Sequence, residues 1–124
     1  MTLPKFRAWV KEEKRMLPVA LINFNQSYTL LEESNGLCCE RDFDEIELMQ
    51  STGLVDKNGK EIFESDIVEV LNSLYTVFYD GEKGSFRLKP HDERWHTDYM
   101  SNFSGGKNFE IISNIYEGVT DDNS

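Results

Sequence analysis

The sequence is short of the residues on which redox and metal chemistry depend. It has two cysteines and two histidines in 124 residues, and the cysteines are adjacent, at Cys38 and Cys39. That spacing fits neither a CxxC redox pair nor a metal-ligand pair, so free thiols in a reducing compartment are expected. The carboxylates that follow Cys39 in the sequence are expected to raise the thiol pKa, which argues against a catalytic cysteine.

Long apolar runs are also missing. The longest candidate, residues 16–24, is much shorter than the roughly 20 residues of a membrane-spanning helix, and it lies too far from the first residue to be a signal peptide. With 39% hydrophobic and 29% charged residues, the composition is that of a folded domain and not of a disordered chain. The protein is therefore expected to be cytoplasmic, with no membrane partner.

Positive charge is scarce outside the first residues. The chain has 13 Lys and Arg against 23 Asp and Glu, a net charge of -10. Residues 1–15 carry a basic excess, so the remainder is more acidic still. Such a body repels phosphate backbones, and no direct nucleic-acid binding is expected. An acidic regulator that imitates DNA and occupies a basic groove of another protein remains an alternative.

The pattern of apolar residues predicts an all-β fold of small antiparallel sheets in a single domain. Alternation and β-branched residues predict strands at residues 5–10, 17–24, 27–31, 66–71, 74–79, 85–89 and 109–116. Residues 42–50 fit a helix or a strand equally well. Thr52-Gly53 and Asn58-Gly59 predict turns, and Pro18 is expected at the start of its strand or on an edge strand. The strands from residue 66 to residue 89 predict a meander.

Three segments together resemble the YopX family of small bacteriophage and prophage proteins. The first is Lys5-Phe6-Arg7-Ala8-Trp9, with Met16 after a charged turn. The second consists of Ile46-Glu47-Leu48-Met49-Gln50, Thr52-Gly53-Leu54, Asp56-Lys57-Asn58-Gly59-Lys60-Glu61-Ile62-Phe63-Glu64 and Asp66-Ile67-Val68. The third consists of Phe109-Glu110-Ile111-Ile112 and Asn114-Ile115-Tyr116-Glu117. The resemblance implies an all-β fold with mixed sandwich and barrel (SH3-like) features, self-association, a phage or prophage origin and no established activity. It predicts one domain over residues 1–124, with N-terminal strands of about 1–50 packed on a barrel-like part of about 51–118.

The sequence departs from the pattern of that family at three positions. Val10 stands where an Asp is common, and Ser65 and Ser113 stand where a Gly is common. Because glycine tolerates a positive φ better than serine does, wider turns are expected at Ser65 and Ser113.

The most site-like segment is residues 91–99, which holds both histidines, three carboxylates and two large aromatic residues. Arg94, Trp95, His96 and Tyr99 are predicted to form an interaction surface, because Trp, Tyr and Arg anchor many protein interfaces. The spacing of His91 and His96 matches neither a helical nor a strand pair of metal ligands, so no metal site is assigned.

No arrangement of residues in the sequence is typical of an active site. We therefore predict no catalytic residue, no cofactor and no metal, and interpret the chain as a non-enzymatic interaction or oligomeric module. Self-association is expected, and a host or phage protein is a further candidate partner. Two alternatives stay open: the acidic regulator or DNA-mimic inhibitor, and a small metal-dependent enzyme that uses His91, His96 and nearby acids.

Overall fold

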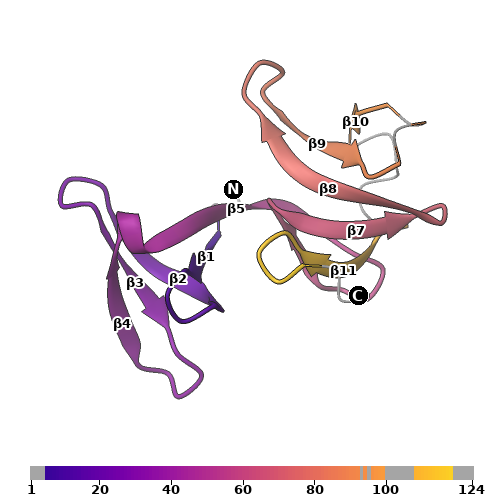
Figure 1. Cartoon of the computed structure of the whole chain (residues 1–124). Coiled ribbons are helices and arrows are strands. Elements are labelled where there is room, and N and C mark those ends of the chain that lie inside the picture. The colour runs from indigo at the N-terminus through magenta and orange to yellow at the C-terminus, as the bar shows by residue number, and fades with distance from the viewer. Residues whose placement is uncertain (1–4, 93, 95, 100–107, 119–124) are drawn as a thin grey trace. The chain divides into compact units, whose positions relative to one another are not determined.

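The structure is a computed structural model that describes residues 5–92, 94, 96–99 and 108–118. These residues form strands and one short 3-10 helix, which confirms the prediction of an all-β fold (Figure 1). The chain divides into two compact units, an N-terminal unit of Met1–Gln50 and a C-terminal unit of Ser51–Ser124. The packing of N-terminal strands on a barrel-like part stays a prediction. Within the described ranges, no helix is long and apolar enough to cross a membrane.

The N-terminal unit is an antiparallel sheet in which β1 to β4 form consecutive hairpins and β5 returns to pair with β1. Its strands belong to a six-stranded sheet with the order β4-β3-β2-β1-β5-β6, in which β6 (Glu61–Phe63) comes from the second unit. The elements are β1 (Phe6–Val10), β2 (Arg15–Asn23), β3 (Tyr28–Glu32), β4 (Cys38–Asp42), the 3-10 helix η1 (Phe43–Glu45) and β5 (Ile46–Val55). Its core consists of the buried side chains of Ala8, Val10, Leu17, Leu31 and Ile46. The ambiguous segment 42–50 is thus a 3-10 turn followed by a strand.

Pro18 lies inside β2, which pairs with β1 on one side and β3 on the other, so the expectation of a strand start or edge strand is wrong. Pro18 is the last residue of β2 that pairs with β1, opposite Arg7, and the pairing with β3 begins at Val19. The missing proline N–H therefore falls where β2 changes partners, and this is why an inner strand tolerates it.

The C-terminal unit is built around a five-stranded antiparallel sheet in the order β10-β9-β8-β7-β11. The elements are β6 (Glu61–Phe63), β7 (Asp66–Val70), β8 (Ser73–Asp80), β9 (Ser85–Pro90), β10 (Asp98–Tyr99) and β11 (Glu110–Asn114). The predicted meander is confirmed as β7-β8-β9. The buried core contains Ile62, Val68, Val70, Tyr75, Val77, Leu88 and Phe109. Among the described residues no pairing joins β10 to β11, so the sheet is open and not a closed barrel.

Two predicted turns have a different form in the structure. Thr52-Gly53 is not a turn, because β5 continues through both residues. Gly53 has a φ of 82° within a register shift between Ser51 and Val55, so this glycine forms a bulge opposite β6. The Asn58-Gly59 turn is confirmed, but only Gly59 has a positive φ there.

The two serines at expected glycine positions behave differently from each other. Ser65 takes up a left-handed conformation with a φ of 73°, so the turn before β7 keeps the backbone conformation that a glycine would have. Ser113 lies within β11, next to a register shift between Ile111 and Ser113, and has no positive φ. The expectation of wider turns is therefore wrong at Ser65 and does not apply to Ser113.

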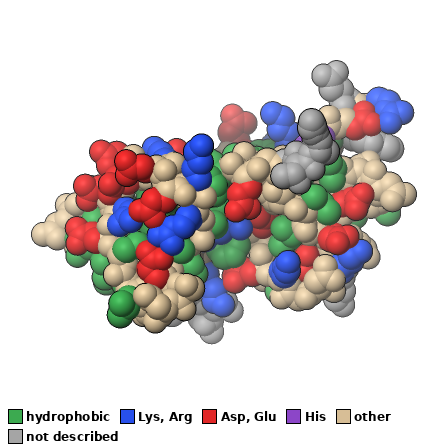
Figure 2. Space-filling view, turned by 60° about the horizontal axis from the view of Figure 1, so that its bottom comes forward, with side chains coloured by type: hydrophobic (Ala, Val, Ile, Leu, Met, Phe, Trp, Pro, Cys, Tyr) green, Lys and Arg blue, Asp and Glu red, His purple; other side chains and the backbone are tan. Residues whose placement is uncertain are grey.

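The charged side chains do not form a single-sign surface on the face shown in Figure 2. Acidic side chains are interspersed there with Lys and Arg, and apolar side chains are visible between them. Mixed charge of this kind is typical of a solvated surface.

Candidate interaction surfaces

The structure describes three of the four residues predicted to form an interaction surface. Arg94 and His96 are exposed, and Tyr99 belongs to β10, where it pairs with Arg87 of β9. Trp95 lies outside the described residues. The predicted surface therefore stays a prediction, and only Arg94 and His96 are placed at exposed positions.

Arg94 is held by a neighbour in its own loop. Its Nη2 donates to Oδ2 of Asp92 at 2.6 Å, and its Nε donates to both carboxylate oxygens at 3.1 Å. These bonds, with one from the Arg94 backbone N–H, lower the pKa of Asp92 to about 2. Asp92 is thus ionised and engaged by a guanidinium.

His91 joins the end of β9 to β8. Its Nε2 lies 2.7 Å from Oγ1 of Thr76, and its backbone N–H donates to the carbonyl of Leu74 at 2.9 Å. Partial burial lowers the pKa of His91, which favours the neutral ring. Within the described part of the chain, no three metal-ligating side chains gather in one place.

Asp56, in the central motif of residues 46–68, accepts hydrogen bonds from backbone N–H groups. It is buried, and its Oδ1 accepts the backbone N–H groups of Asn58 and Lys60, each at 2.9 Å. Its Oδ2 accepts the N–H of Ile111 from β11 at 3.0 Å. Burial alone would raise the pKa of Asp56, but the three N–H donors outweigh it and the pKa is lowered. The carboxylate therefore ties the turn at residues 56–60 to β11.

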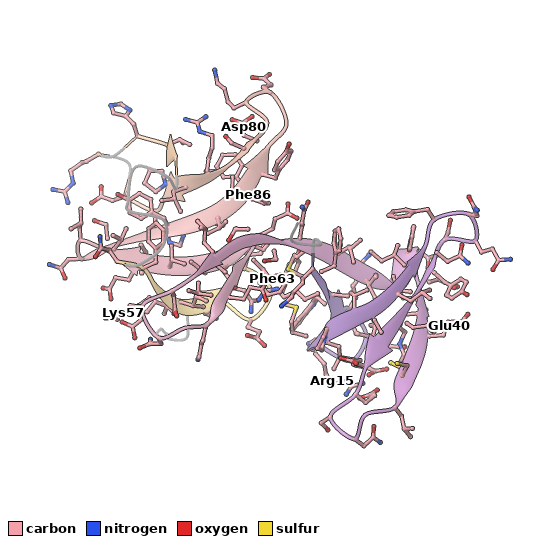
Figure 3. The ribbon with its side chains drawn as sticks, turned by 180° about the vertical axis from the view of Figure 1, so that it is seen from behind. Arg15, Glu40, Lys57, Phe63, Asp80 and Phe86 are labelled. Carbon is pink, nitrogen blue, oxygen red and sulfur yellow. The ribbon has the colours of Figure 1, made fainter. Side chains whose placement is uncertain are left out.

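The same turn makes a second bond to the β11 region. The backbone N–H of Lys57, labelled in Figure 3, donates to the carbonyl of Phe109 at 2.9 Å. Farther along the motif, Oδ2 of the buried Asp66 accepts the N–H of Phe63 at 2.8 Å. The carboxylates of the motif thus bond to backbone amides, which is an architectural use of these residues.

A network of charged side chains lies on the N-terminal unit around Arg15, which is labelled in Figure 3. The Arg15 guanidinium donates to Glu33 at 2.7 and 2.9 Å and to Glu13 at 2.6 and 2.9 Å. Arg41 donates to the other carboxylate oxygen of Glu13. The Arg15 bonds lower the pKa of Glu33 to about 2. The four side chains are thus linked in series, from Glu33 through Arg15 and Glu13 to Arg41.

The two cysteines are free thiols in different surroundings. Cys38 is exposed, whereas Cys39 is half-buried beside Glu33. Burial raises the pKa of the Cys39 thiol, and a hydrogen bond to Glu33 raises it further. The raised pKa of Cys39 agrees with the predicted direction. The carboxylate that contributes to it is Glu33 of the β3–β4 hairpin, however, and not one of the residues that follow Cys39.

The β2–β3 hairpin carries apolar surface that the sequence analysis did not single out. Phe24 is 71% exposed, and its ring packs edge-on against Phe43 of η1 with centroids 6.0 Å apart. Beside it, a shallow hollow of about 370 Å³ is lined by Leu21, Ile22, Asn23, Phe24 and Asn25. We call Leu21, Phe24 and Phe43, with this hollow, the Phe24 surface.

A second exposed apolar residue lies at the β7–β8 turn. Leu71 and Asn72 have φ values of 52° and 62°, and Leu71 is 79% exposed. We call these two residues the Leu71 turn. The charge pattern of the sequence could have indicated both features, because residues 16–31 and 70–79 are the two longest stretches without Asp, Glu, Lys or Arg.

The two open antiparallel units and the backbone-bound carboxylates of the central motif define a small all-β protein. The chain belongs to the YopX family, because the sequence model of that family, described as YopX protein, matches residues 5–119. The crystal structure of protein EF1440 from Enterococcus faecalis is similar, with 30% sequence identity, a TM-score of 0.62, and coverage of 94% of this chain and 96% of that chain. No curated protein matches. The family resemblance found in the sequence is confirmed.

Proposed function

We propose that the protein is a non-enzymatic phage or prophage accessory protein that acts through protein contacts and self-associates in the cytoplasm of its host. The observation that carries this proposal is the exposure of large apolar side chains within two uncharged stretches of the sequence, Phe24 at 71% and Leu71 at 79%. Full burial of such a side chain stabilises a contact by about 1.5–3 kcal/mol. Contiguous apolar surface commonly marks a site of protein interaction, and on the Phe24 surface Leu21 and Phe24 line one hollow while Phe43 packs against Phe24.

The charged groups that could have served catalysis support the same proposal. Asp56 is bonded to backbone amides, Asp92 to Arg94, and Glu33 to Arg15. Each of these contacts is sufficient to explain why the carboxylate is ionised and held in place. A general acid or base needs instead a pKa moved toward the working pH.

The test is native mass spectrometry on the full chain after gentle purification from a bacterial host, with light scattering over a range of concentrations. We expect masses that are multiples of 14.4 kDa, with the oligomer favoured as concentration rises. A monomer at every concentration, with nothing bound, would contradict the proposal. A stoichiometric host protein in its place would make that protein the partner, and a bound metal ion would favour the enzyme alternative.

A second candidate function is the acidic regulator, and one local observation supports it. Glu40 and Asp42 alternate along the edge strand β4 and are exposed, and Asp44 and Glu45 follow in η1, also exposed. Four carboxylates on one short segment could occupy a basic groove. If this is the function, added duplex DNA competes with the captured partner, whereas a partner held through apolar contacts is not displaced by DNA.

A further inference from the structure

The chain has two Asn-Gly pairs, Asn35-Gly36 and Asn58-Gly59, and both lie in exposed turns. In each pair the glycine N–H donates to the carbonyl three residues before the glycine, at 3.0 Å. Both glycines have a positive φ, 87° in the first pair and 83° in the second. Because the two turns share this backbone arrangement, a difference in their chemistry must come from the side chains around them.

An exposed asparagine that precedes a glycine is open to deamidation, because no side chain shields the glycine nitrogen. That nitrogen gives its proton to solvent and attacks Cγ of the asparagine, which closes a succinimide ring. The Cγ–Nδ2 bond breaks, and the leaving group takes a proton from solvent and departs as ammonia. Water then opens the ring at one of its two carbonyls. The product is aspartate or isoaspartate, and in isoaspartate the main chain is one atom longer.

In the turn that holds Asn58, a carboxylate keeps the backbone in place. Oδ1 of Asp56 accepts the N–H groups of Asn58 and Lys60, each at 2.9 Å, and its Oδ2 accepts the N–H of Ile111 at 3.0 Å. The nitrogen of Gly59 must leave the Asp56 carbonyl before it can attack, so the turn must first open. The carboxylate bonds on either side of Gly59 oppose that opening, and the need to break one of them slows the reaction by about tenfold or more.

The carboxylate at the corresponding position of the other turn is engaged elsewhere. Glu33, which corresponds to Asp56, accepts bonds from the guanidinium of Arg15 at 2.7 and 2.9 Å. Oδ1 of Asn35 accepts the N–H of Leu37 at 3.0 Å, which is a hydrogen bond between neutral groups. This turn is therefore expected to open more readily, and Asn35 provides a matched comparison within the same chain.

We propose that Asn58 is a deamidation site whose reaction is slowed by Asp56, and that its conversion to isoaspartate releases β11 from the turn. The extra main-chain atom would lie between the N–H groups of residues 58 and 60, so Oδ1 of Asp56 could no longer accept both in their present geometry. The same carboxylate binds Ile111 of β11, and the N–H of Lys57 donates to the carbonyl of Phe109 at 2.9 Å. Since ammonia is lost to solvent, the change is irreversible.

Incubation of the full chain at mildly alkaline pH, in buffer and in guanidinium chloride, measures the rates at the two sites. Peptide mass spectrometry follows the replacement of the side-chain NH2 by OH. In guanidinium the rates should be similar, because glycine follows each asparagine. In buffer, Asn58 should react at least about tenfold more slowly than Asn35. Equal rates in buffer would overturn the role of Asp56, and an Asn58 that does not react in guanidinium would overturn the site itself.

Two variants separate the effect of Asp56 from that of the turn as a whole. Asp56→Asn removes the charge and should speed the reaction at Asn58 in buffer. Glu33→Gln is the matched change in the other turn and should leave the rate at Asn35 unchanged, because the Glu33 carboxylate bonds to Arg15. An unchanged rate at Asn58 in Asp56→Asn, or an equal acceleration at Asn35 in Glu33→Gln, would contradict the role assigned to Asp56.

The consequence for β11 is tested on protein that has been modified in guanidinium and refolded. Forms with isoaspartate at position 58 or at position 35 are separated by chromatography, and their amide hydrogen exchange is compared. The Ile111 amide should lose protection in the first form and keep it in the second, while β7 and β8 stay protected in both. Asn58→Asp has the other product with a main chain of normal length, and it should keep Ile111 protected. Protection kept at Ile111 in the first form, or lost throughout that sheet, would overturn the proposed release.

Discussion

The substitution Asp56→Asn tests whether the central motif acts by fastening β11 to the turn at residues 56–60. An asparagine side chain has nearly the same shape, and its single oxygen can still accept the N–H groups of Asn58 and Lys60. The amide nitrogen then faces the N–H of Ile111, where Oδ2 now accepts a bond of 3.0 Å. Losing that charge-assisted bond and leaving the donor without an acceptor should lower the free energy of unfolding by roughly 2–4 kcal/mol.

Urea unfolding measures the total effect, and amide hydrogen exchange locates it. In Asp56→Asn we expect the Ile111 amide to lose protection while the Asn58 and Lys60 amides keep most of theirs. Asp56→Ala, which leaves all three donors without the carboxylate, should expose all three amides and cost more. An unchanged urea midpoint in Asp56→Asn, or equal loss of protection in the two variants, would refute the role assigned to Asp56.

The same carboxylate predicts a pH dependence. The pKa of Asp56 in the folded protein lies below its ordinary value of 3.8, because the three backbone donors outweigh burial. Its contribution to stability is therefore fully present above that ordinary value, and it is lost as the pH falls through the folded pKa. The stability difference between the wild type and Asp56→Asn should shrink as the pH is lowered from neutral into that range. A difference that stays constant would contradict the assignment.

The remaining predictions concern other parts of the chain. Ser65→Gly should raise the free energy of unfolding by about 1 kcal/mol in urea, because a φ of 73° is unfavourable for serine; an unchanged or lower value would contradict this. Iodoacetamide should alkylate Cys38 faster than Cys39, and Glu33→Gln should speed the reaction at Cys39, as followed by peptide mass spectrometry; equal rates at the two thiols would contradict the raised pKa of Cys39. Titration with zinc or manganese should leave the melting temperature unchanged, whereas a stabilising shift would revive a metal site at His91 and His96.

The strands that sequence reasoning found are those in which apolar residues alternate and pack on a core. The buried positions of β8 follow this pattern, whereas residues 66–68 of β7 are all buried and its β-branched residues are the signal. The strand β4 was missed because its residues, Cys38–Asp42, are mostly polar and alternate only between exposed and half-buried. Its conformation is set by backbone pairing with β3, which has no signature in the hydrophobic pattern. Gly53 was misread for a related reason, since turns and bulges both use positive φ and only the partner strand β6 distinguishes them.

The candidate surfaces were harder to predict than the fold. Residue types alone pointed to Arg94, Trp95, His96 and Tyr99, because Arg and aromatic residues are frequent in interfaces. Exposure of Phe24 depends on where β2 and β3 end, and that boundary is a property of the strand pairing and not of local sequence. The strain at Leu71 is a property of its φ value, which no residue type reveals.

Ser65 and Leu71 show why backbone strain must be weighed together with its surroundings. Both residues have a positive φ that favours glycine. At Ser65, the backbone N–H donates to Val77 at 2.7 Å and the carbonyl accepts from Ile115 at 2.9 Å, so the turn before β7 is fastened on both sides within the chain. These bonds offset the strain, and the left-handed serine needs no further explanation. The Leu71 side chain is 79% exposed, so burial contributes little to offset the strain at that turn.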